Sequence, residues 1–386
     1  MDYELSAQEQ AFAAEVRALA ERELAPRALE ADRQGAFPVA NLPPLVDAGL
    51  LAMAIPAEYG GRPRSTLEYA LAMEELSAAC AATAVLVSVH NSLVAEPLAR
   101  WGTPEQRAAY LPELARGERI GAFALTEPSA GSDAASLQTR ARRDTGGYRL
   151  RGSKCFTTNS RLAGLFLVFA TLDPSQGARA ITAFLVERDT PGFTIGPADH
   201  KLGIRASPSA QLFFDDCFVP ETRRLGGEGE GWRVAMSTLD SGRIGIAAQA
   251  LGIARAAYEA SLAWVRRQRA ASAVGQGAEW VLADMSVRLD AARLLVHRAA
   301  ALKDAGRRVT REAAAAKLFA SETAMWLTSA ALDLHGADAC ALDTPVQRYF
   351  RDAKITEIYE GTSEIQRVII AEQLLRAAAP APAGAG

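Results

Sequence analysis

An acidic residue directly before a glycine, near the C-terminal end of the chain, has the residue types that proton transfer needs. The pair is Glu360 and Gly361. Ser363 and Gln366 fit the S-x-x-Q pattern of a helix N-terminus, so we predict a helix beginning just after Ser363 and a turn that carries Glu360. Glycine lets the backbone approach a ligand closely, and a carboxylate there could remove a proton from a bound molecule. These residues alone favour the alternative, that Glu360 is an ordinary turn residue.

Two segments upstream have side chains that suit a bound ligand. In residues 123–133 a short strand runs into a loop of small residues, which offers N–H groups and hydroxyls to a phosphate or a polar planar ring. The loop lacks the pattern of a P-loop, and an ordinary loop explains it equally well. In residues 154–159, Phe156 and Thr158 would share one face of a strand end, where a ring can stack. A half-buried edge strand is the alternative there.

A third segment is an acidic and a basic residue on one face of a helical stretch. Asp240 and Arg243 flank Ser241 and Gly242. The simple interpretation is an ion pair between positions i and i+3. The functional interpretation is a contact with an anionic or amide group of a ligand that extends towards Glu360.

The composition excludes several classes of function. The chain has 386 residues, 49% of them hydrophobic, and a formal net charge of -3, which gives no basis for binding nucleic acid. Its four cysteines form no CxxC pair, so we expect neither a zinc site nor a disulfide framework. Each cysteine is expected to be a buried apolar residue, and a reducing cytoplasm fits them. No signal peptide or membrane span is expected, and the four histidines suggest no metal site.

The pattern along the chain is helical, then strand-rich, then helical again. We expect an N-terminal helical domain over 1–118, a central β domain over 119–225, a helical domain over 226–377 and a disordered tail over 378–386. Residues 144–147 predict a hairpin turn. A stripe from Trp280 to Leu295 is expected to be core. The expected strands are 121–126, 137–142, 148–151, 165–171, 181–187 and 211–218, and the main helices are 66–79, 82–100, 232–270, 278–304, 311–334, 345–358 and 364–377.

Four motifs in this order and at this separation resemble the acyl-CoA dehydrogenase family, from about residue 5 to residue 377. They are Ala124-Leu125-Thr126-Glu127-Pro128 with Gly131-Ser132-Asp133, then Lys154 with Thr158-Asn159, then Lys201-Leu202-Gly203-Ile204-Arg205, then Tyr359-Glu360-Gly361-Thr362-Ser363-Glu364. The resemblance implies an α+β fold with an N-terminal helical domain, a central β-barrel or sandwich-like domain and a C-terminal four-helix bundle.

The resemblance also implies FAD and a set of site residues. Glu360 falls on the position of the catalytic base, and Gly242 on a position where some members carry a base instead, so we expect Glu360 to act alone. Phe156 stands where the family often has tryptophan against the flavin. The implied FAD contacts are Phe123, Leu125, Thr126, Gly131, Ser132, Phe156, Thr157, Thr158, Arg266, Gln276, Thr362 and Glu364, and the implied substrate contacts are Ser132, Asp240, Arg243 and Gly361.

The chemistry implied is α,β-dehydrogenation of an acyl thioester to the trans-2-enoyl product, as in fatty acid metabolism. A thioester α-hydrogen becomes removable when its carbonyl oxygen accepts hydrogen bonds that strengthen as an enolate forms. The acyl group could be carried by CoA or, in members from secondary metabolism, by an acyl-carrier protein. An electron-transfer flavoprotein is the expected acceptor, and a homo-oligomer, tetramer or dimer, is the expected assembly.

Two segments depart from the family pattern. The run 266–276 lacks the usual Phe-Gly, although Arg266 and Gln276 remain, and the run 333–340 begins with Asp333 where glutamine is usual. Both belong to the nucleotide half of the implied FAD site, where an anion would repel a pyrophosphate. Ala84, at a position where dicarboxylyl-specific members tend to have arginine, argues against a glutaryl-type substrate. A flavin-dependent monooxygenase and a flavin-poor partner-binding paralogue are the alternatives, and Glu360 argues against the former.

Overall fold

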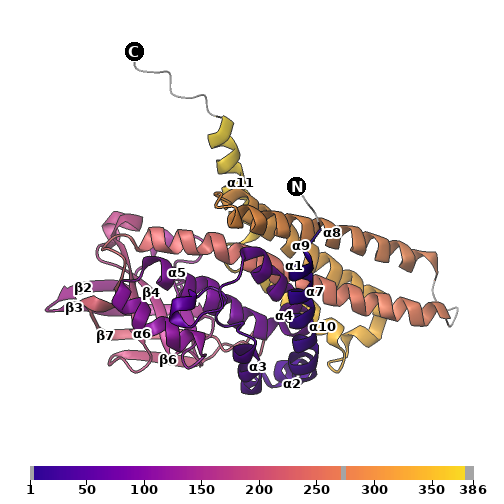
Figure 1. The fold of residues 1–386 in the computed structure, drawn as a ribbon, viewed down its shortest axis with the longest axis horizontal. Helices are drawn as coiled ribbons and strands as arrows, with labels where there is room; N and C mark the ends of the chain where they lie inside the picture. Colours follow the sequence, from indigo (N-terminus) through magenta and orange to yellow (C-terminus); the bar gives the residue numbers. More distant parts are fainter. Residues whose placement is uncertain (1–3, 271–274, 379–386) are drawn as a thin grey trace, which may run out of the picture.

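The computed structural model describes residues 4–270 and 275–378, and it has the three-part order that the sequence predicts. Figure 1 shows the sheet at one end, the long C-terminal helices at the other and the N-terminal helices packed along both. The prediction of a disordered tail concerns 378–386, of which 379–386 lie outside the described residues.

The N-terminal part is helical because small and apolar residues recur at helical spacing behind capping residues. Ser65 and Thr103 accept hydrogen bonds from the backbone N–H groups of Glu68 and Gln106, and both helices begin there. The predicted interruption between residues 79 and 82 lies at Cys80, whose φ of -153° kinks one continuous helix. The helices are α1 Ala7–Leu19, α2 Ala25–Gln34, α3 Leu42–Asp47, α4 Thr66–Ser88, the π-helical η4 Val89–Ala95, α5 Glu96–Trp101 and α6 Pro104–Ala115.

The central part is one eight-stranded sheet in the order β6-β7-β3-β2-β4-β5-β8, with β1 paired parallel to β4. The predicted hairpin turn is confirmed, because Asp144 pairs with Gly147. Two strands were missed: β6 contains Gly196 and Pro197, which mask its alternation, and β8 has only two residues. The strands are β1 Gly121–Ala124, β2 Arg140–Asp144, β3 Gly147–Thr157, β4 Leu165–Thr171, β5 Ile181–Glu187, β6 Phe193–Ala198, β7 Ala210–Pro220 and β8 Arg224–Leu225.

The C-terminal part consists of long helices packed around α7 and α9 (Figure 1). The predicted run 345–358 is shorter in the structure, because α10 ends at Lys354 and a 3₁₀ turn, Ile355–Glu357, follows it. Its helices are α7 Gly231–Ala270, α8 Gln276–Asp304, α9 Thr310–His335, α10 Pro345–Lys354 and α11 Ser363–Ala378.

Two expectations about burial were wrong in part. In the α8 stripe, Met285 and Leu289 are buried as expected, but Trp280 is 63% exposed and Leu294 is also exposed. Only part of the stripe therefore faces the core, and the rest lies on the exposed side of α8. Three cysteines are buried, whereas Cys340 is exposed in the short 3₁₀ segment after α9. One helical stretch, Thr66–Trp101, is long and apolar enough to cross a membrane, but 89% of its apolar window is buried inside the fold.

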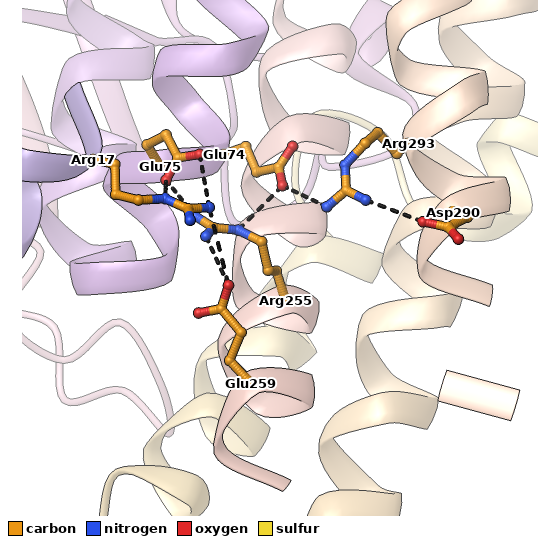
Figure 2. Close-up of polar contacts among 7 residues, drawn as sticks. All are labelled: Arg17, Glu74, Glu75, Arg255, Glu259, Asp290 and Arg293. Carbon is orange, nitrogen blue, oxygen red and sulfur yellow. Dashed lines mark hydrogen bonds and ion pairs between the residues drawn. The ribbon is translucent and has the colours of Figure 1, made fainter. Parts of the chain in front are cut away.

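A buried ion-pair network ties α4, α7 and α8 together (Figure 2). Arg255 on α7 is almost fully buried and contacts the carboxylates of Glu74 and Glu75 on α4 at 3.2 and 2.5 Å. Arg293 on α8 reaches Glu74 at 2.8 Å. Burial raises the pKa of Glu74, but the pairing with Arg293 and Arg255 outweighs it and holds that pKa below its usual value. These charges hold α7, which carries Asp240 and Arg243, against α4 and α8.

Candidate active site

Glu360 lies in a tight turn between the 3₁₀ turn Ile355–Glu357 and α11. Its φ is 53° and that of Gly361 is 95°, so two consecutive residues are left-handed. A left-handed glutamate is strained and persists only where its surroundings hold it. Lys317 Nζ on α9 donates to Gly361 O at 2.7 Å, and Gln366 Nε2 donates to the same oxygen at 2.8 Å. These two donors hold the turn.

The carboxylate of Glu360 is directed towards α7. Its Oε2 atom is buried and has no hydrogen-bond partner among the residues that the structure describes. A Cβ atom built on Gly242 would lie only 2.0 Å from that oxygen, so the glycine makes room for the carboxylate. Burial raises the pKa of Glu360 to about 7, while the nearby charges of Arg243 and Lys317 act to lower it. A carboxyl group with this pKa can both accept and release a proton near neutrality.

The predicted capping box at Ser363 was wrong by one residue. Thr362 Oγ1 accepts from Ile365 N at 3.3 Å, which places the cap at Thr362, and α11 begins at Ser363. Ser363 Oγ is buried and has no partner within the described part of the chain. Gln366 serves the turn instead, since its amide donates to the carbonyl oxygens of Glu360 and Gly361. Consecutive Thr and Ser residues both fit a cap, so the pattern alone could not choose between them.

Asp240 and Arg243 form the ion pair that the simple interpretation predicted. Arg243 donates to Asp240 at 2.5 Å, and Thr310 on α9 donates to the other carboxylate oxygen at 3.0 Å. Arg243 is only 5% exposed. Burial lowers the pKa of Arg243, and the charges of Asp240 and Glu360 act against that shift. The pair therefore also sets the electrostatic environment of Glu360.

The loop after β1 is held by a buried ion pair that the sequence analysis missed. Lys154 Nζ on β3 donates to Glu127 Oε1 at 2.7 Å and to Leu125 O at 3.0 Å, and both charged side chains are buried. The same carboxylate accepts backbone N–H groups from Gln138 and Thr139 at 2.5 and 2.9 Å. Burial lowers the pKa of Lys154 to about 8 despite the opposing charge of Glu127. Both residues lie in the quoted motifs, and here they act as the support of the loop.

The predicted FAD contacts on this loop lie at different depths. Phe123 is half-buried against Phe169, with ring centroids 5.1 Å apart, and Leu125 is buried. Thr126 is half-buried, and its carbonyl accepts from Cys155 N at 3.0 Å. The two remaining contacts, Gly131 and Ser132, are exposed.

The end of β3 presents an aromatic ring to the outside. Phe156 has a φ of 54° and is 73% exposed, and the register with β7 shifts between Lys154 and Thr157. The strand ends at Thr157, so the regular alternation expected for Phe156 and Thr158 does not extend to Thr158. Asn159 anchors the segment, because its amide donates to Leu86 O on α4 and to Gly121 O on β1.

These residues fit a planar cofactor with a polar edge. The exposed ring of Phe156 offers a stacking face. Thr157 Oγ1 is buried and unpaired in the described residues, which is unusual for a hydroxyl and suits a hydrogen bond to a bound group. The exposed loop at Gly131 and Ser132 adds N–H and hydroxyl groups.

The predicted nucleotide contacts lie at the other end of the C-terminal helices. Arg266 on α7 and Gln276 at the start of α8 are both exposed, and residues 271–274 between them lie outside the described residues. A cavity of about 620 Å³ opens beside them between α7, α8 and α9, and Trp264, Trp326 and Asp333 line it. Asp333 is exposed, so water screens its charge in the single chain.

The structure thus assembles two groups of the predicted residues. Glu360, Gly361, Asp240 and Arg243 meet where α7, α9 and the turn before α11 converge. The predicted flavin contacts of residues 123–132 and 156–158 lie in the central domain instead, on β1 and the loop after it and at the end of β3. Glu364 is exposed in the first turn of α11. Sequence reasoning missed Lys317, which lies in an alanine-rich helical run without any motif around it.

Comparison with known proteins places this arrangement in a family. Three family models match consecutive parts of the chain: acyl-CoA dehydrogenase N-terminal domain over residues 6–118, middle domain over 122–217 and C-terminal domain over 229–375. The chain belongs to the acyl-CoA dehydrogenase family. It is a flavoprotein oxidoreductase of the acyl-CoA dehydrogenase type.

Individual relatives agree over nearly the whole length. The short-chain-specific acyl-CoA dehydrogenase of Clostridium acetobutylicum is 44% identical over 379 residues, covering 97% of this chain and 100% of the relative. The solved butyryl-CoA dehydrogenase of Megasphaera elsdenii has a TM-score of 0.93 and 40% identity over 97% of this chain and 100% of that one. A structure described as the electron transferring flavoprotein of Acidaminococcus fermentans matches with a TM-score of 0.94 and 41% identity over the same shares. These similarities do not favour the acyl-carrier-protein alternative.

Proposed function

We propose that the protein catalyses FAD-dependent α,β-dehydrogenation of a short acyl-CoA to the trans-2-enoyl-CoA, and that Glu360 removes the α-proton. One observation carries this assignment: the carboxylate of Glu360 is buried and unpartnered within the described chain, and it faces a glycine on α7. Buried carboxylates ordinarily have hydrogen-bond partners, so one without a partner suits proton transfer to a ligand.

The backbone of the turn polarises the substrate carbonyl, and nearby charged side chains set the protonation of Glu360. A backbone N–H of the Glu360-Gly361 turn donates to the thioester carbonyl, and this bond strengthens as the enolate develops. Arg243 and Lys317 limit the rise of the pKa of Glu360, so a useful fraction of the base is ionised at neutral pH. Asp240 orients Arg243, and Ser132 and Gly361 complete the substrate contacts.

When bound, FAD would supply the acceptor for the β-hydrogen, which leaves as hydride. We propose that the ring of Phe156 packs against the flavin, that Thr157 and Thr158 bond its polar edge, and that the loop Phe123, Leu125, Thr126, Gly131 and Ser132 holds the ribityl chain. Arg266 and Gln276 would contact the nucleotide half from a neighbouring subunit, with Thr362 and Glu364 completing the site. The helix cap that Thr362 makes is compatible with this role, because a hydroxyl oxygen can donate while it accepts.

The electron acceptor that we propose is an electron-transferring flavoprotein. A solved structure with that description shares the fold over 97% of this chain. We also propose a homo-oligomer, and the position of Arg266 and Gln276 at the far end of the helices, away from Phe156, supports it. We keep the domain boundaries near residues 118, 225 and 377 as part of the same proposal.

The test combines a spectrum with a dye-reduction assay. Purified protein should show flavin absorption, and butyryl-CoA should reduce a dye through it. Glu360→Gln should retain the flavin spectrum and lose at least about 10²-fold in rate, because a general base is expected to contribute ~10²–10⁴-fold. Glu357→Gln is the matched control, since Glu357 lies three residues away and pairs with Lys354.

Three outcomes would overturn the proposal. Full activity of Glu360→Gln would show that another group removes the proton. Protein that neither carries flavin nor takes up added FAD would favour the partner-binding paralogue. Oxygenation of substrate without dehydrogenation would favour the monooxygenase.

A further inference from the structure

A second cavity lies close to Glu360, along the face of α7 that carries Gly242 and Gly245. Its volume is about 210 Å³, and it is lined by residues 53–54, the start of α4, η4, the first residue of α5, α7 and α8. Ser241 lines it and directly precedes Gly242, which faces Glu360. Tyr69 also lines the cavity. Its hydroxyl packs against Gly245, one turn further along α7, and would lie 2.6 Å from a Cβ atom built on that glycine. Gly242 and Gly245 are three residues apart and share one face of the helix, so the cavity adjoins the site at Glu360.

An ion pair closes the cavity on the side of α8. Lys303 Nζ donates to Glu96 Oε1 at 2.9 Å and also to Ser241 Oγ. Ser241 Oγ in turn donates to Glu96 Oε1 at 2.8 Å. Glu96 and Lys303 both line the cavity, and their side chains are only partly buried, at 31% and 28% exposed.

The pair leaves one donor and one acceptor for a ligand. An ammonium group has three protons, and Lys303 uses two of them within the described residues. Glu96 Oε2 makes no hydrogen bond in that part of the chain, since the contacts of its carboxylate all involve Oε1. A hydroxyl group both donates and accepts, so it complements this pair. An aliphatic end would displace water from the pair and replace none of its hydrogen bonds.

We propose that Glu96, Lys303 and Ser241 form the far end of the acyl pocket and select acyl thioesters whose chain ends there in a hydroxyl group over equally long aliphatic chains. This inference rests on the function proposed above and adds the class of acyl group to it. A short aliphatic chain that stops before the charged pair is also accepted, because the rest of the cavity is large enough for water to solvate the pair.

The experiment compares ratios within one enzyme preparation. The substrates are butyryl-, hexanoyl- and octanoyl-CoA and the ω-hydroxy forms of the two longer chains. In the wild type, kcat/KM for the ω-hydroxy form should exceed that of its aliphatic counterpart by ~10-fold or more at the length that reaches the pair. In Glu96→Leu/Lys303→Met, an apolar replacement of similar size, the preference should reverse. A ratio is insensitive to the fraction of folded enzyme.

The control is Lys354→Met, which removes an exposed ion-pair lysine from α10 and should leave the ratio unchanged. The inference is overturned if the wild type prefers the aliphatic form at every length, or if the double variant keeps the wild-type ratio. In either case, activity with butyryl-CoA still supports the proposed dehydrogenase function. Inactivity of the wild type with every acyl-CoA refutes the proposed function, and this inference with it.

Discussion

Replacing Gly242 by alanine should separate the activity of this protein from its stability. The added Cβ would lie 2.0 Å from Glu360 Oε2, 2.9 Å from its carboxyl carbon and 3.0 Å from Leu93 Cδ2, whereas ordinary contacts begin near 3.4 Å. The carboxylate must therefore move by about 1.4 Å. A displacement of ~1 Å from reacting geometry costs about 10²-fold in rate, so we expect a loss of at least that size.

The same replacement should leave the free energy of unfolding unchanged or raise it slightly. Alanine is favoured over glycine inside a helix by roughly 1 kcal/mol, and this gain offsets the new contact with Leu93. Gly252→Ala is the contrasting variant on the same helix. Its Cβ would lie 2.2 Å from the backbone oxygen of Glu74, so it should weaken the packing of α7 on α4 without reaching Glu360.

The assay is stopped-flow reduction of the bound flavin by butyryl-CoA, with urea unfolding measured on the same proteins. We expect Gly242→Ala to be slow and stable, and Gly252→Ala to be less stable. A Gly242→Ala enzyme within about threefold of the wild-type rate would refute the argument, because Glu360 would then act from a position that tolerates the displacement.

Three further predictions test the electrostatics. Because burial raises the pKa of Glu360 to about 7, kcat/KM should rise with pH as the base ionises and level off above that pKa; a flat profile between pH 6 and 8 would contradict this. Lys317→Met removes a charge that lowers this pKa and a donor that holds the turn, so the inflection should move to higher pH; an unmoved inflection would show that Lys317 is only structural. Arg255→Met removes one partner from each of two buried carboxylates, Glu74 and Glu75, and should lower the free energy of unfolding in urea by about 3 kcal/mol. The control Glu259→Gln, at a half-exposed residue, should lower it by under about 1 kcal/mol. Equal losses would contradict a stabilising role for the network.

The elements that could be predicted are those whose signal is local. β4 and β5 agree with prediction at both ends, because each is a continuous apolar run without helical spacing. The hairpin turn at residues 144–147 was found from its glycines and aspartate. β6 was missed because Gly and Pro interrupt it, and its place in the sheet depends on β7, a distant segment.

The same distinction holds for the candidate site. Glu360 was found because its neighbours have a recognisable pattern. Lys317 is 43 residues away from it in the chain, and only the packing of α9 brings its ammonium group to the turn. Glu127 and Lys154 were quoted as motif residues, but their pairing across 27 residues follows from the sheet. Contacts of this kind require the topology, which composition and periodicity do not contain.

Because the backbone at Glu360 is left-handed, selecting variants for heat resistance alone would favour the loss of this glutamate. A non-glycine residue at φ 53° carries a conformational cost of roughly 1–3 kcal/mol, and its carboxyl group is buried without a partner inside the described chain. Glycine at position 360 would relieve both penalties and abolish the proposed base. A library screened for residual fold after heating should therefore enrich Glu360→Gly, so any effort to stabilise this protein needs turnover as a second criterion.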